Sequence, residues 1–133
     1  MKAISPTEKQ IQDSIIEYLR LKKYMIIRLN SGNQFIEGKN GKTYRIKLSD
    51  PGTPDILAFG QKENYSTTSG STIGIISLSI PLSYHPLNLY FIEVKRPGGK
   101  VTELQRQKME ELERFGAKCL VIHSLEELQR QLV

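Results

Sequence analysis

The sequence predicts an α/β fold in which a mixed central β-sheet is flanked by helices. Short apolar runs with the length of buried strands, among them 56–59 and 89–92, alternate with longer segments of helical periodicity. Capping signals of the type Ser/Thr-x-x-Glu/Gln open two of the helical segments. A chain of 133 residues has the size of one domain with a modest core, so we expect residues 1–133 to form a single domain.

The first helix is expected to begin with Ser5 as its N-cap and to end at about Leu21. Pro6 suits the first helical position, and Glu8 would close a capping box with Ser5. Apolar residues recur on one helix face at positions 11, 15, 18 and 19, and Glu8 falls in the middle of that face. Glu8 therefore has two readings, as a capping residue or as an inward-facing carboxylate, and the two are compatible.

A strand over 24–29 and a β-hairpin follow this helix. Asn40-Gly41 between the alternating runs 34–37 and 42–47 is a strong hairpin signal. Residues 50–54 then form a tight turn, in which Asp50 is interpreted as an ordinary turn residue. The segment from about 61 to 88 is interpreted as an insertion, whose β-prone octet 73–80 suits an edge strand or a dimer surface.

The strand over 89–95 carries charge where a buried strand should have none. Tyr90, Ile92 and Val94 point one way, whereas Glu93 and Lys95 share the other face. Asp55, at the start of the preceding strand, adds a second carboxylate beside them. Two carboxylates and a lysine suit a phosphodiesterase that uses Mg²⁺, because this ion prefers oxygen ligands and an ammonium stabilises the transition state. The plain alternative is an exposed, salt-bridged edge strand.

The last third of the chain predicts a helix, a strand and a short helix. Thr102 and Gln105 form a capping box that opens a helix to about Phe115, and Gly116 ends it. Its expected apolar face comprises Leu104, Met109, Leu112 and Phe115. A strand over 117–122 contains Cys119, which we interpret as a core residue, and Ser124 starts the last helix.

Composition narrows the class of protein. Charged residues make up 25% and hydrophobic residues 38% of the chain, which is typical of a soluble globular domain. No apolar run has the length of a membrane span, and residues 1–6 lack the apolar core of a secretory signal. One cysteine cannot form an internal disulfide, so a reduced, cytoplasmic location is expected.

Positive charge is concentrated in one block. Residues 20–47 hold eight basic side chains and one acidic side chain, a net +7, so the rest of the chain carries −2 of the total of +5. Such a block favours a polyanion as partner, most simply a phosphate backbone. A solvated surface is the alternative.

The motifs resemble a known nuclease family. Pro54-Asp55 followed by Glu93-Val94-Lys95 matches the P-D…(D/E)-x-K nuclease pattern. The wider sequence, with Gly-Thr-Pro-Asp-Ile, then Ile-Glu-Val-Lys-Arg-Pro-Gly-Gly-Lys, then Gln105, resembles the virus-type replication-repair nuclease (VRR-NUC) domain from Glu8 to about Leu128, except for the insertion. The resemblance implies a restriction-endonuclease-like core and a deoxyribonuclease that depends on Mg²⁺ or Mn²⁺.

The resemblance also implies roles for individual residues. Asp55 and Glu93 would bind the metal, with the main-chain carbonyl of Val94 and the carboxylate of Glu8 as further candidate ligands. Lys95 would be the catalytic lysine, and Gln105 would point at the active site in addition to its capping role. The candidate DNA contacts are polar and basic: Arg28, Asn30, Ser31, Lys42, Arg45, Lys47, Arg96 and Lys100.

Stand-alone members of this family resemble Holliday junction resolvases. A homodimer that cuts four-way junctions is therefore the preferred interpretation, because a two-fold dimer suits a two-fold substrate. A nuclease acting on flaps, nicks or duplex DNA is the alternative within the same class. A DNA-binding module without turnover is the alternative from another class. The family name connects the chain with phages and mobile elements.

Overall fold

The chain folds around a four-stranded mixed sheet of the restriction-endonuclease-like type, as predicted. The computed structural model describes residues 4–29, 33–47, 49–61 and 87–132. Its elements are α1 (Glu8–Leu21), β1 (Met25–Arg28), β2 (Asn33–Glu37), β3 (Thr43–Lys47), β4 (Ile56–Gln61), β5 (Leu87–Val94), α2 (Glu103–Arg114), β6 (Lys118–Ile122) and α3 (Leu125–Gln131). The sheet order is β1-β4-β5-β6, with β5 and β6 parallel and the other pairs antiparallel.

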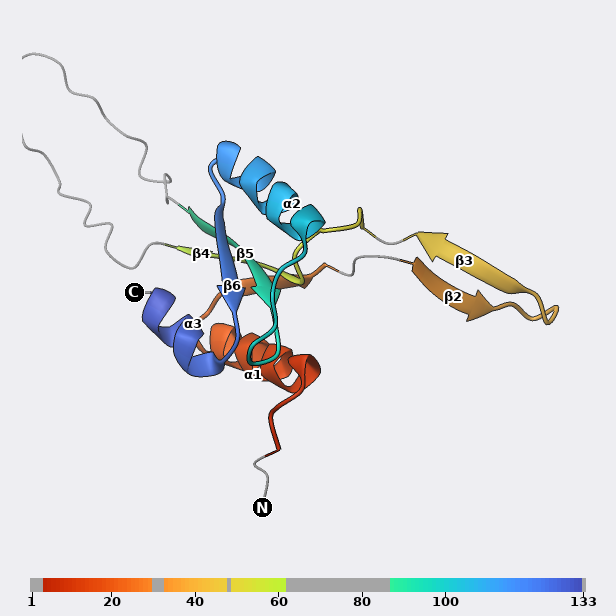
Figure 1. Cartoon of the computed structure of the whole chain (residues 1–133), viewed down its shortest axis with the longest axis horizontal. Coiled ribbons are helices and arrows are strands. Elements are labelled where there is room, and N and C mark those ends of the chain that lie inside the picture. Colours follow the sequence, from red (N-terminus) through yellow and green to blue (C-terminus); the bar gives the residue numbers. More distant parts are fainter. Residues whose placement is uncertain (1–3, 30–32, 48, 62–86, 133) are drawn as a thin grey trace, which may run out of the picture.

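The two faces of the sheet are covered by different helices. Figure 1 shows α1 and α3 on one side of the sheet and α2 on the other. Because side chains alternate along a strand, Tyr90, Ile92 and Val94 enter the core between the sheet and α1, as the sequence predicts. The opposite face of β5 therefore carries Phe91 and Glu93 toward α2.

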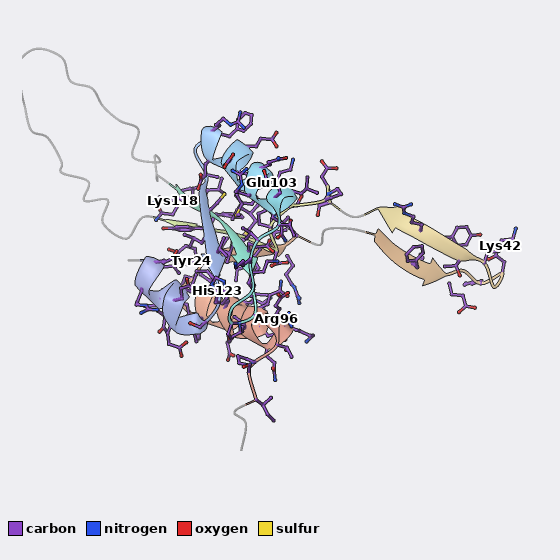
Figure 2. All side chains as sticks on the ribbon, in the orientation of Figure 1. Tyr24, Lys42, Arg96, Glu103, Lys118 and His123 are labelled. Carbon is purple, nitrogen blue, oxygen red and sulfur yellow. The ribbon has the colours of Figure 1, made fainter. Side chains whose placement is uncertain are left out.

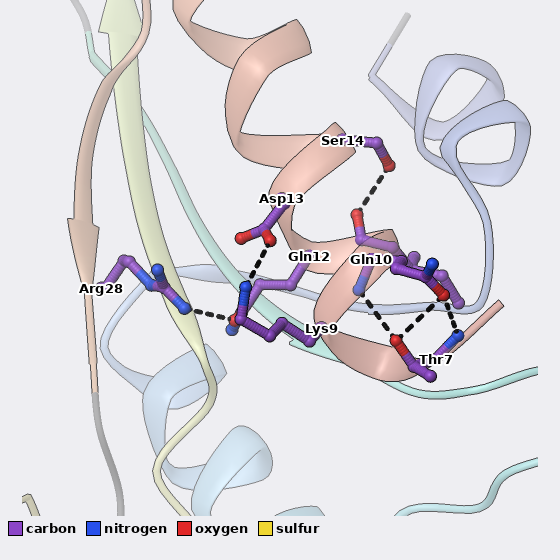
Figure 3. A network of polar contacts seen from close by, with 8 residues as sticks. Thr7, Lys9, Gln10, Gln12, Asp13, Ser14 and Arg28 are labelled. Carbon is purple, nitrogen blue, oxygen red and sulfur yellow. Dashed lines mark hydrogen bonds and ion pairs between the residues drawn. The ribbon is translucent and has the colours of Figure 1, made fainter.

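The first helix begins two residues later than predicted. Thr7, not Ser5, is the N-cap, and Gln10, not Glu8, completes the capping box (Figure 3). Two capping signals overlap in this sequence, Ser5-x-x-Glu8 and Thr7-x-x-Gln10, and the structure uses the second. The capping interpretation of Glu8 is thus wrong, and its side chain is released for other contacts.

The predicted apolar face of α2 is only half correct. Met109 is buried, but Leu104 is 50% exposed and Phe115, at the C-cap, is 86% exposed. The helix packs mainly against β6, so much of its surface stays exposed. At that contact the Cys119 thiol donates to the carbonyl of Met109 at 3.5 Å. Burial raises the pKa of Cys119 to about 11, which fits a packing residue rather than a nucleophile.

The hairpin and the insertion flank the aspartate turn. β2 and β3 pair antiparallel, as predicted, and form a separate two-stranded sheet. β4 and β5 pair antiparallel from Ile56↔Ile92 to Gln61↔Leu87. Most of the insertion, including the predicted strand 73–80, lies outside the described residues. Among the residues that are described, no helix is long and apolar enough to cross a membrane.

Candidate active site

The strand register places both candidate carboxylates at one end of the sheet. Ile56 in β4 pairs with Ile92 in β5. Asp55, one residue before Ile56, therefore stands opposite Glu93, one residue after Ile92, on the face that α2 covers. The turn before β4 fixes the approach to Asp55, because the amide and hydroxyl of Thr53 both donate to the carbonyl of Asp50, at 3.1 and 2.6 Å.

Asp55 is anchored through both its side chain and its main chain. The Val94 N–H donates to Oδ2 of Asp55 at 2.7 Å, and the Leu29 N–H donates to its carbonyl at 2.7 Å. Burial raises the pKa of Asp55. The Val94 N–H and the Lys95 ammonium oppose that rise, whereas the Glu8 carboxylate adds to it.

Glu93, on the face of β5 that α2 covers, is buried and only 2% exposed. Its Oε1 accepts from Nζ of Lys95 at 2.6 Å and from Nε2 of Gln105 at 2.6 Å. Burial raises the pKa of Glu93, the Lys95 hydrogen bond lowers it, and the Asp55 and Glu8 carboxylates raise it further. Negative charge is therefore crowded at this point, which is the condition that a bound cation relieves.

Gln105 closes the capping box of α2 and also contacts Glu93. Its Oε1 accepts from the Thr102 N–H at 2.9 Å, which closes the capping box of α2. Its Nε2 is thereby directed at Glu93. The exposed edge-strand alternative for Glu93 and Lys95 is wrong, because the Lys95 side chain is only 13% exposed and β5 lies between two other strands.

Glu8 joins the site from the first residue of α1. Its Oε1 accepts from the Arg96 N–H at 3.3 Å, across 88 residues of sequence. This contact ties the helix to the chain segment directly after Lys95. Because its charge raises the pKa of both Asp55 and Glu93, Glu8 contributes to the same negative field.

The family comparison agrees with this geometry. The model of the VRR-NUC domain matches residues 7–126. The chain belongs to the VRR-NUC domain family. The match implies a nuclease acting on DNA, and it spans all the residues that gather at the site. No curated protein and no solved structure matches the chain.

The candidate DNA contacts of this VRR-NUC domain fall into separate regions. Arg96 and Lys100 are exposed on the segment that follows Lys95. Arg28 donates from Nη2 to Oε1 of Gln12 at 2.7 Å, in the network of Figure 3, and its charge lowers the pKa of Asp55. Lys42 and Arg45 lie on the β2–β3 hairpin, and Figure 2 shows Lys42 near its tip, away from the central sheet. Asn30, Ser31 and the side chain of Lys47 are outside what the structure describes.

Sequence reasoning missed a contact made by His123. Its Nε2 lies 2.9 Å from the carbonyl of Gly99, and its Nδ1 lies 3.1 Å from Oε2 of Glu127. The ring thus connects α3 to the glycine turn that follows Lys95. The spacing Ser124-x-x-Glu127, a capping signal, was the available clue to the position of Glu127.

The donor set suits a hard divalent cation. Two carboxylates meet beside the main chain of Val94, and each uses one of its oxygens in the hydrogen bonds given above. Mg²⁺ is held in proteins by one or two carboxylates together with waters and substrate phosphate. Within the described residues, no three His, Cys, Asp or Glu side chains form a cluster able to hold a metal by themselves.

Proposed function

We propose that this VRR-NUC domain is a DNA endonuclease that depends on Mg²⁺ or Mn²⁺ and prefers branched DNA, with four-way junctions as the first substrate to test. The observation that supports it best is the meeting of Asp55, Glu93 and Lys95 at one end of β4 and β5. Burying a glutamate and its lysine partner costs desolvation free energy, and such pairs are typical of functional sites.

The metal would be held by the carboxylates of Asp55 and Glu93 and the carbonyl of Val94. When bound, such an ion neutralises charge on the scissile phosphate and lowers the pKa of a coordinated water. The Val94 N–H fixes one oxygen of Asp55, and Gln105 fixes one oxygen of Glu93. The two anchors orient the carboxylates before any substrate arrives, which preserves the geometry that the reaction needs.

Lys95 is the residue we assign to the reacting phosphate. Its main-chain N–H donates to the carbonyl of Ile122 at 2.9 Å, which holds the lysine at the end of the sheet. The ion pair with Glu93 directs its ammonium toward the carboxylates. In that position the ammonium orients the attacking water and stabilises the negative charge that develops on the phosphoryl oxygens.

The preference for junctions and the homodimer rest on likeness to stand-alone family members. A two-fold dimer would present two copies of the site to the two symmetric strands of a junction. Nuclease activity on flaps, nicks or duplex is the second candidate. A module that binds without cutting is disfavoured, since binding alone does not call for a buried Glu93–Lys95 pair.

The test is a cleavage assay on end-labelled single-stranded, duplex, nicked, flap and four-way junction DNA. Each substrate is incubated with EDTA, Mg²⁺ or Mn²⁺, using wild type, Asp55→Asn and the exposed control Glu126→Gln. We expect paired, metal-dependent cuts near the branch point that Asp55→Asn abolishes and Glu126→Gln retains. Cuts on other substrates would support the second candidate, and binding without any cut would favour the module.

A further inference from the structure

The β2–β3 arm, residues 33–47, exposes aromatic rings on both of its faces. Figure 1 shows it standing apart from the central sheet. Phe35 is 65% exposed and pairs across the strands with Arg45. On the other face, Tyr44 is 48% exposed and pairs with Ile36, which is 43% exposed. Large apolar side chains on both faces of a two-stranded sheet point to an interaction surface.

Tyr44 is held in place before any partner binds. The side-chain amide of Asn40 donates to the Tyr44 hydroxyl at 2.8 Å. The ring lies over Gly38, where an added Cβ would come within 2.5 Å of Cε2 of Tyr44. Glycine at this position thus leaves the room that the ring occupies. A ring held through its hydroxyl by Asn40 and packed over Gly38 loses little conformational entropy when a partner binds.

Cations surround these rings. Lys39 and Lys42 lie in the turn and Arg45 lies in β3, all exposed, against the single acidic Glu37 between residues 35 and 45. Figure 2 shows Lys42 near the tip of the arm. Aromatic rings interspersed with exposed cations are typical of surfaces that stack on nucleobases and hold the flanking phosphates. A second protein of this charge would be repelled, whereas a polyanion is attracted.

The arm leaves the core beside the candidate carboxylates. Leu29, which donates its N–H to the carbonyl of Asp55 at 2.7 Å, is separated from Asn33 by three residues. That chain spans at most about 14 Å. The base of the arm therefore lies near the end of the sheet that carries Asp55 and Glu93.

From these observations we infer that the β2–β3 arm binds unstacked nucleobases at interruptions of the DNA duplex. Phe35 and Tyr44 stack on bases exposed at the branch point, and Lys39, Lys42 and Arg45 hold the phosphates on either side. Bases inside an intact duplex are already stacked, so the rings discriminate branched DNA from duplex, whereas the cations favour both. This inference rests on the proposed function and names the element that gives it structure preference.

The test measures DNA binding in EDTA, where no metal-dependent cleavage occurs. Its result is therefore independent of the cleavage assay. Fluorescence titration uses a four-way junction with 2-aminopurine at the branch and a duplex with 2-aminopurine at an internal pair. The Phe35→Ala/Tyr44→Ala variant should lose about tenfold to a hundredfold in junction affinity, with duplex affinity unchanged. Tyr44→Phe, which keeps the ring, should retain the preference. Lys42→Ala should weaken binding to both the junction and the duplex. It should also reduce the slope of log K against log salt concentration by about one, the value for one lost phosphate contact.

Two outcomes would overturn the inference. One is an unchanged ratio of junction to duplex affinity in the double alanine variant, given that its melting temperature shows a folded core. The other is a loss of dimer in sedimentation velocity with junction affinity per protomer intact, which would make the arm a contact between protein chains. If the wild type does not cut any substrate but gives the expected 2-aminopurine signals, this result counts against the proposed function alone.

Discussion

Replacing Gly52 with alanine tests whether the turn before β4 positions the candidate site. Gly52 has φ +85°, and an added Cβ would lie 2.7 Å from the main-chain oxygen of Leu104 in the first turn of α2. Ordinary contact begins near 3.4 Å, so the two segments must separate by 3.4 − 2.7 = 0.7 Å. Since the obstructing atom is backbone, no side-chain rotation can relieve the clash.

The cost has two parts. A positive φ at a residue with a Cβ costs about 1–2 kcal/mol. Forcing an extra carbon against packed backbone costs about 1–3 kcal/mol more. At roughly 3–4 °C per kcal/mol for a chain of this size, the Gly52→Ala melting temperature should fall by about 6–20 °C. Because Gln105 follows Leu104, the displacement also lengthens its contact with Glu93 and should lower kcat/KM about tenfold or more.

Gly116→Ala is the matched control. Gly116 has φ +90°, but nothing lies within 4 Å of the position of its added Cβ. This variant therefore incurs the backbone strain without the contact and lies at the far end of α2. Thermal melting and junction cleavage of both variants separate the two effects. If Gly52→Ala melts no lower than Gly116→Ala and cleaves as well, the close approach to Leu104 does not hold the site.

Three further predictions concern the site itself. Lys95→Ala should lower the cleavage rate by about 10²-fold or more without weakening DNA binding, whereas the control Lys108→Ala, whose side chain pairs with Glu111 on α2, should leave the rate unchanged; equal rates for both variants would remove Lys95 from the reaction. Burial raises the pKa of Glu93, so the folded state binds the proton of this carboxyl group more tightly than the unfolded state does. The stability that the protonated group contributes is therefore complete below the pKa of the unfolded state, about 4.3. It is lost as pH rises through the pKa of the folded state. Melting curves in EDTA should therefore show that Glu93→Gln raises stability most at neutral pH, and a pH profile parallel to that of wild type would contradict the assignment. Gln105→Glu keeps the capping box but sets a second carboxylate against Glu93, so we expect the helix to form and cleavage to fall about tenfold; an unaffected rate would show that the amide donor is dispensable.

The sequence predicted which residues gather at the candidate site better than it predicted the details of packing around them. Glu93 and Lys95 interrupt an apolar strand, and because burying a charged side chain costs free energy, this departure from the apolar pattern indicated the candidate site. The order of the elements followed from local signals such as Asn40-Gly41 and Gly116. These signals act within a few residues and need no knowledge of the tertiary structure.

The errors have tertiary causes. Ser5 and Thr7 are equally suitable N-cap residues when only the neighbouring sequence is considered. The contact of Glu8 with Arg96, which lies far away in the sequence, is compatible with Thr7 as the N-cap. Phe115 satisfies the helical period, yet it is 86% exposed, because it lies at the C-cap and α2 meets the sheet mainly along β6. The link from His123 to Gly99 likewise joins two loops whose proximity depends on the parallel pairing of β5 and β6.

In the antiparallel pair β4 and β5, the candidate carboxylates lie at one end and the long connection between the strands leaves from the other end. Asp55 and Glu93 lie at the end that begins with Ile56↔Ile92, whereas the chain between the strands leaves from Gln61↔Leu87. Closing a longer loop costs only about 0.6 kcal/mol for each doubling of its length. Foreign sequence spliced into that connection would therefore leave the carboxylates in register. The domain thus offers a natural graft point for a fluorescent reporter or a targeting module that can be exchanged without redesigning the nuclease.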